Sequence, residues 1–82
     1  MAQQYVKGQI TDAETGEPLP YASAVYKGHN VAVISDLEGE YSIARHAGWS
    51  ITFSSVGYKS KVVLINASTK SPLNIALEAE HT

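Results

Sequence analysis

The stretch SDLEGEYSI, Ser35–Ile43, places three carboxylates around one glycine, and its interpretation decides the fold. Asp36, Glu38 and Glu40 are compatible with a calcium loop, an acid/base pair or a bend between two strands. Calcium takes about six to eight oxygen ligands, and the Asp-x-Asp-x-Asp-Gly spacing is absent here. An acid/base pair needs a cleft that raises one pKa. The pattern therefore favours a hairpin turn with Gly39 at positive φ.

Short segments with alternating apolar and polar residues continue outward from this turn in both directions. In WSITFSS, for example, Ile51 and Phe53 share one face. Alternation with one apolar face is typical of an antiparallel sheet against a core. Gly, Pro, Asn and Asp separate the segments and favour turns. We therefore predict seven strands in a β-sandwich, at residues 4–11, 21–27, 31–35, 40–44, 49–55, 58–65 and 72–78.

The same alternation predicts which side chains form the core. The expected core residues are Val6, Ile10, Ala24, Ile34, Tyr41, Ile43, Ile51, Phe53, Val63, Leu73, Ile75 and Leu77. The segment KVVLI, residues 61–65, is apolar on both faces and is expected to form a more buried strand. Gly57 interrupts a strand-like run, which predicts a positive φ or a closely packed backbone neighbour.

Length and composition limit the kinds of protein this chain can be. The 82 residues predict one domain over residues 1–82, with an ordered core at about 4–79. The formal net charge is −2 and the six basic residues are scattered, which argues against a nucleic-acid partner. The absence of cysteine excludes disulfides and thiolate nucleophiles. No apolar window reaches the roughly 18 residues of a membrane span. The start MAQQYVKG has neither the basic region nor the apolar region of a signal peptide.

Histidines and aromatic residues are the remaining candidates for a site. His29, His46 and His81 fall in predicted turns or the tail without the spacing of a shared metal, so we expect solvated side chains. We predict no catalytic, cofactor or metal-binding residue.

Aromatic side chains offer a candidate ligand or partner surface, which we assign to Trp49, Tyr21 and Tyr5. With Tyr58 they could form a platform on which sugar rings stack. In the alternative interpretation, Tyr58 and Tyr26 face the core and Trp49 covers one edge of the sandwich.

Four motifs occur in an order that resembles the carboxypeptidase-regulatory-like domain over residues 5–78. They are Gly-x-Ile-x-Asp at 8–12, Gly-Glu-Pro-Leu-Pro at 16–20, Asp-x-x-Gly-x-Tyr at 36–41 and Phe-x-x-x-Gly-Tyr at 53–58. The resemblance implies an all-β, seven-stranded antiparallel Greek-key sandwich of the transthyretin-like (prealbumin-like) type. One branch of that superfamily hydrolyses 5-hydroxyisourate, but its N-terminal His and Tyr-Arg-Gly-Ser tail are missing here.

This variety of the domain is similar to N-terminal extensions of outer-membrane β-barrel proteins such as TonB-dependent nutrient transporters. The resemblance implies a non-enzymatic interaction module in the cell envelope, on the periplasmic side of the outer membrane, without a cofactor. Its partners would be other domains of a larger cell-envelope protein or periplasmic proteins. The alternative is a weak carbohydrate-binding module with a glycan ligand. Position 21 is often glycine in the transporter versions and is tyrosine here.

Overall fold

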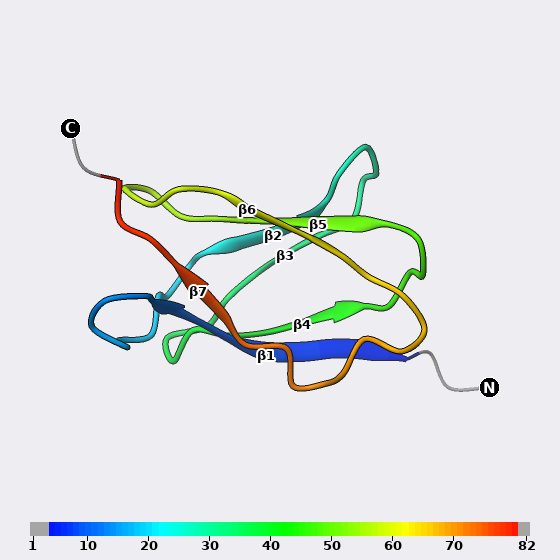
Figure 1. Cartoon of the computed structure of the whole chain (residues 1–82), viewed down its shortest axis with the longest axis horizontal. Coiled ribbons are helices and arrows are strands. Elements are labelled where there is room, and N and C mark those ends of the chain that lie inside the picture. The colour runs from blue at the N-terminus through cyan, green and yellow to red at the C-terminus, as the bar shows by residue number, and fades with distance from the viewer. Residues whose placement is uncertain (1–3, 81–82) are drawn as a thin grey trace.

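The computed structural model describes residues 4–80, in which seven strands form two layers (Figure 1). No helix within this part of the chain is long and apolar enough to cross a membrane. One sheet has the strand order β4-β1-β7 and the other has the order β3-β2-β5-β6. The strands are β1 (Tyr5–Asp12), β2 (Ser23–Tyr26), β3 (Ala32–Ile34), β4 (Glu40–Ala44), β5 (Ser50–Ser54), β6 (Lys61–Leu64) and β7 (Ile75–Leu77). The all-β, seven-stranded sandwich is confirmed.

One strand pair departs from the expected antiparallel arrangement. β1 pairs with β7 in parallel, with Ile10 opposite Ile75, whereas the other four ladders are antiparallel. Parallel neighbours require a long connection, and here the chain passes through both sheets between β1 and β7. The prediction of a wholly antiparallel sandwich is therefore wrong at this one pair.

The acidic stretch forms a turn, but the turn is not a hairpin. β3 belongs to the four-stranded sheet and β4 to the three-stranded sheet, so the chain crosses between layers here. Buried Ser35 fixes the crossing, because its hydroxyl donates to the Leu19 carbonyl at 2.7 Å and accepts from the Ala22 N–H at 2.9 Å. The prediction of paired strands on either side of Asp36 is wrong, whereas the positive φ of Gly39, 75°, is confirmed.

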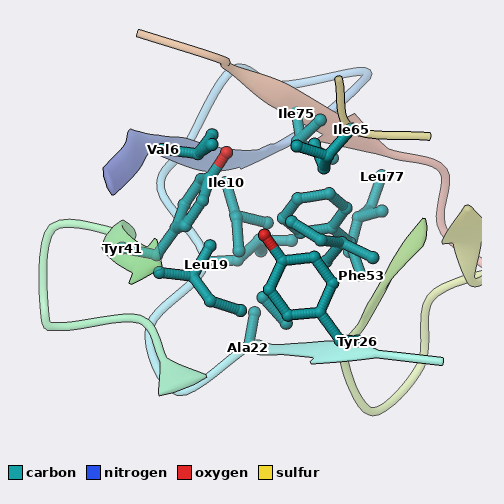
Figure 2. Close-up of a cluster of buried hydrophobic side chains, with 13 residues drawn as sticks. Val6, Ile10, Leu19, Ala22, Tyr26, Tyr41, Phe53, Ile65, Ile75 and Leu77 are labelled. Atoms are coloured by element: carbon teal, nitrogen blue, oxygen red, sulfur yellow. The ribbon is translucent and has the colours of Figure 1, made fainter. Parts of the chain in front are cut away.

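The core lies between the two sheets and draws side chains from both (Figure 2). Most of the predicted core residues are buried, but Ile34 is 66% exposed, and Val63 and Leu73 are only partly buried. β3 has three residues, and its inward-facing residue is Val33. The prediction that Ile34 faces the core was therefore wrong by one position along the strand. Four residues complete the core beyond that prediction: Leu19, Ala22, Tyr26 and Ile65.

β6 is an exposed edge strand rather than the buried strand expected from KVVLI. It is the last strand of its sheet, and Val62 and Leu64 are 56% and 59% exposed. The apolar pattern could not reveal that the outer face of this sheet is uncovered. Gly57 lies in the turn that precedes β6 and has the predicted positive φ, 87°.

Candidate interaction surface

The outward face of the four-stranded sheet carries no charged side chain at its strand positions. Rows of cross-strand partners define this face, such as Ala32–Val25–Thr52–Val62 and Ile34–Ser23–Ser54. Together with Ser50 and Leu64 these nine residues are small, hydroxylic or aliphatic. We call them the outer sheet face. Such a surface binds water weakly compared with a charged face and is suited to contact with another protein surface.

An open hollow of about 340 Å³ adjoins one end of the outer sheet face. We call it the Tyr21 hollow. It is lined by Tyr21, Ser23, Ser54, Ser55, Val56, Tyr58 and Ser60. All seven side chains are uncharged, and Tyr21 is 70% exposed while Val56 is fully exposed. The hollow therefore presents two aromatic rings and one aliphatic side chain among serine hydroxyls.

Tyr21 is held in a conformation that tyrosine rarely adopts. Its φ is +60°, and it is the one non-glycine residue with positive φ in the described part of the chain. Its N–H donates to the Ser35 carbonyl at 3.1 Å, next to the bonds that fix the crossing between the sheets. A left-handed conformation costs an L-residue roughly 1–2 kcal/mol. Because the Tyr21 side chain is mostly exposed, burial does not offset that cost.

Tyr58 connects the hollow to the end of β1. Its hydroxyl donates to Asp12 Oδ2 at 2.7 Å, while Asp12 Oδ1 accepts from the backbone N–H groups of Glu14 and Thr15. The Tyr58 hydrogen bond is the main cause that lowers the pKa of Asp12, and the same bond raises the pKa of Tyr58. The hydrogen bond to Asp12 therefore holds the Tyr58 ring in place where it lines the hollow.

We expect the Tyr58–Asp12 bond to make stability depend on acidity. The folded-state pKa of Asp12 lies below its ordinary value of 3.8, so its contribution is present above that pH and is lost as pH falls through the folded pKa. Tyr58→Phe should lower the melting temperature at pH 7, and the difference from the parent should shrink below about pH 4. Thermal unfolding from pH 7 to pH 2.5 measures this. A difference that stays constant over that range would contradict the assigned coupling.

Trp49 lies away from the hollow, with both ring faces covered. His29 stacks on it at 3.5 Å and His46 at 4.1 Å between ring centroids, nearly parallel in each case. Two imidazoles cannot share one face at these short distances, so they lie on opposite faces. Tyr26 meets the same ring edge-on. The two histidines sit in turns as expected, but their rings pack on Trp49, and this stack leaves no open indole face for a sugar. His81 lies outside the described residues.

The three aromatic residues proposed as one surface are not together. Trp49 immediately precedes β5 and Tyr21 lies by the far end of that strand, near Ser54. Five residues of extended chain separate these ends by about 16 Å. Tyr5 is on β1 in the other sheet, opposite Ala44. Tyr21 alone of the three lies in the hollow. The sequence analysis did not identify Val56, because no local pattern shows that an apolar side chain in a turn lies beside Tyr21.

A known domain family matches almost the whole chain. The family model of the CarboxypepD_reg-like domain matches residues 6–82. The chain belongs to this family. The TonB-dependent receptor P26 of Formosa agariphila (strain DSM 15362 / KCTC 12365 / LMG 23005 / KMM 3901 / M-2Alg 35-1) is 35% identical over 79 residues. That alignment covers 96% of this chain and 8% of the receptor, so the domain corresponds to a small part of a much longer protein.

The motif residues of this CarboxypepD_reg-like domain hold the backbone together. A Cβ on Gly8 would lie 1.9 Å from the Leu73 carbonyl oxygen, so glycine lets the two segments touch. The Tyr41 hydroxyl donates to the same Leu73 carbonyl at 2.6 Å. Asp12 caps the turn after β1 and binds Tyr58. These residues are thus engaged in the fold.

Tyr21→Gly should stabilise the CarboxypepD_reg-like domain. Glycine adopts positive φ without strain, and the exposed Tyr21 ring contributes little buried area. We expect a gain of about 1 kcal/mol, or about 4–8 °C in melting temperature. Tyr21→Ala, which keeps the strain and removes the ring, is the matched control and should leave the melting temperature nearly unchanged. A Tyr21→Gly variant that melts below the parent would show that the ring stabilises the fold.

In the acidic turn, the Asp36 carboxylate hydrogen-bonds to the backbone. Asp36 Oδ1 accepts from the N–H groups of Glu38 at 3.0 Å and Glu40 at 2.9 Å. Within residues 4–80 no three His, Cys, Asp or Glu side chains are arranged to hold a metal ion. The Asp36 side chain therefore stabilises the turn by accepting hydrogen bonds from the backbone, as aspartate commonly does in turns.

We expect calcium to have almost no effect on melting. At a calcium concentration ten times the Kd, a real site would add about 1.4 kcal/mol to the free energy of unfolding. For a domain of this size, that corresponds to a rise of roughly 5–10 °C in melting temperature. The melting temperature should differ by less than about 2 °C between EDTA and about 5 mM calcium. Differential scanning calorimetry provides the measurement. A rise of about 5 °C that disappears in Asp36→Asn would identify a calcium-binding loop.

Proposed function

We propose that this domain is a non-catalytic connecting module of an outer-membrane TonB-dependent receptor, on the periplasmic side of that membrane. The observation that carries the proposal is the similarity to the receptor P26 over nearly the whole domain. Membership of the CarboxypepD_reg-like family supports a role other than catalysis. The motif residues support it as well, because Gly8, Asp12 and Tyr41 make contacts that maintain the fold.

The path of the chain through the domain suits a connection between two neighbours. Gln4 accepts a backbone hydrogen bond from Arg45 at one end of the sandwich, and Glu80 donates one to Gly57 at the other. The described chain therefore enters and leaves at opposite ends of a molecule whose longest dimension is 44 Å (Figure 1). A folded spacer of this kind holds its two neighbours in the polypeptide a fixed distance apart, which a flexible linker does not do.

Protease accessibility tests the location. In cells that produce the receptor carrying this domain, protease added outside should leave the domain uncut while the outer membrane is intact. After permeabilisation of the outer membrane, the turns at residues 13–18 and 66–72 should become accessible. Immunoblotting with an antibody to the isolated domain follows the cleavage. Cleavage in intact cells would overturn the periplasmic placement.

A further inference from the structure

Tyr21 combines a strained backbone with an exposed ring, and folding stability does not explain that combination. Its φ is +60° and its side chain is 70% exposed. Among residues 4–80 no aromatic ring packs against it. Backbone strain that the surrounding fold maintains without a packing gain is a feature of binding sites. The ring is therefore placed for contact with something outside the domain.

The surroundings of Tyr21 have the chemistry of a protein contact. The chain has 14 charged residues, 8 acidic and 6 basic, yet none lines the Tyr21 hollow or lies on the outer sheet face. Tyrosine with serine supplies rigid contact area and adaptable hydrogen bonds in protein recognition. A sugar site would pair its aromatic ring with carboxylate, amide or guanidinium side chains. The hollow has none of these, so the observations favour a protein surface.

The hollow lies where the described chain ends. Ala79 forms a β-bridge with Tyr58, and the Glu80 N–H donates to the Gly57 carbonyl at 2.8 Å. Residues beyond Glu80 therefore start beside the turn that carries fully exposed Val56. A folded unit attached there by a short linker would meet the Tyr21 hollow first and the outer sheet face next.

The size of the surface argues for a neighbour on the same polypeptide rather than a second copy. Four strands about 4.8 Å apart and about 16 Å long give a face of about 300 Å². A stable complex between separate molecules buries about 800 Å² on each partner. A covalently attached neighbour needs much less area, because a short linker holds it at an effective concentration in about the millimolar range.

We propose that the Tyr21 hollow and the outer sheet face together bind the domain that comes after Glu80 in the same polypeptide, through an uncharged, largely apolar surface on that domain. This inference rests on the proposed function, since it requires a longer receptor chain. It assigns a binding role to Tyr21 and Val56, which have no such role in the fold itself. It also accounts for the apolar edge of the sheet at Val62 and Leu64, which would otherwise remain open to solvent.

Cysteine labelling tests the docking, because residues 1–82 contain no cysteine of their own. Val56→Cys reports on the hollow, and Ala47→Cys, in an exposed turn at the other end of the domain, is the matched control. Each variant is made both in the 82-residue chain and in the full receptor polypeptide. Maleimide modification is followed by mass spectrometry of the peptide that contains the site. We expect Val56→Cys to react at least tenfold more slowly in the full polypeptide and Ala47→Cys to react equally in both.

A second substitution shows whether Tyr21 forms the contact. Tyr21→Lys keeps a non-glycine residue at the strained position and places a charge in the hollow, so it should restore fast labelling of Val56→Cys in the full polypeptide. Equal labelling of Val56→Cys in the two chains would overturn the proposal, as would protection that Tyr21→Lys leaves unchanged. Protection that appears in the 82-residue chain as its concentration rises would identify a second copy as the occupant instead.

The two proposals can fail separately. Protease cleavage in intact cells together with slow Val56→Cys labelling would overturn the periplasmic location and leave the docking supported. Protection from protease in intact cells together with fast Val56→Cys labelling would support the periplasmic location and overturn the docking. A natural polypeptide that ends at Thr82 would overturn the docking, because no later domain would exist.

Discussion

Phe53→Ala is expected to lower the free energy of unfolding by about 3–5 kcal/mol, through lost burial and the cavity that remains. Phe53, the fourth of the five residues of β5, is fully buried and meets Tyr41 edge-to-face across the core, with 5.3 Å between ring centroids. At roughly 0.05–0.15 kcal/mol per residue, a domain of this length has about 4–12 kcal/mol in total. The melting temperature should therefore fall by roughly 15–30 °C, as measured by circular dichroism.

Two variants control for the position and chemistry of this change. Phe53→Leu keeps most of the apolar volume and should cost clearly less than Phe53→Ala. Val62→Ala removes an aliphatic side chain from the exposed face of the same sheet and should change stability by less than about 0.5 kcal/mol. If Phe53→Ala melted like the parent, the assignment of the inner face of β5 would be wrong.

Gly39→Ala is expected to destabilise the domain by about 2–5 kcal/mol for two separate reasons. The φ of Gly39 is +75°, which alanine adopts only under strain. A Cβ there would also lie 2.5 Å from the Ile10 carbonyl oxygen and 3.0 Å from the Leu19 nitrogen. Those two atoms hydrogen-bond to each other at 2.9 Å, and the Ile10 N–H donates to the Gly39 carbonyl at 2.7 Å. An added methyl group would force this junction apart.

Gly28→Ala separates the two reasons. Gly28 has a similar φ, +81°, but an added Cβ would meet no atom within 4 Å. Its substitution should therefore cost about 1 kcal/mol from the backbone strain alone. Chemical denaturation of both variants measures the free energy of unfolding that each loses. The extra loss in Gly39→Ala is the cost of the steric clash at Gly39. Equal losses in the two variants would show that no tight junction exists between the acidic turn and β1.

The location of the turns followed from short-range chemistry. The stretch SDLEGEYSI predicted a turn with Gly39 at positive φ, and the structure has both, although the turn joins strands of different sheets. A carboxylate that accepts nearby N–H groups and a residue without a Cβ act within a few residues. Likewise, the alternation in β4 and β5 predicted buried Tyr41, Ile43, Ile51 and Phe53, because side chains in a strand alternate between faces whatever the strand pairs with.

The candidate site depended on arrangements that no local pattern contains. The sequence identified Tyr21, Trp49 and Tyr5 as aromatic residues of interest, but the sandwich places Trp49 between two imidazoles and Tyr5 in the other sheet. The strain at Tyr21 depends on its bond to Ser35, where the chain crosses between layers. The uncharged character of the hollow appears only when β2, β5 and the 55–60 segment meet.

The amino-acid sequence by itself determined the seven strands, the turns between them and most inward-facing residues, because these depend on interactions between residues close in the chain. Only the tertiary structure decided that β3 and β4 lie in different sheets, that β7 runs parallel to β1, and that β6 is an edge with Val62 and Leu64 exposed. These features depend on which distant strands pair and which sheet face stays uncovered. An apolar strand has the same local pattern whether a second layer covers its outer face or not.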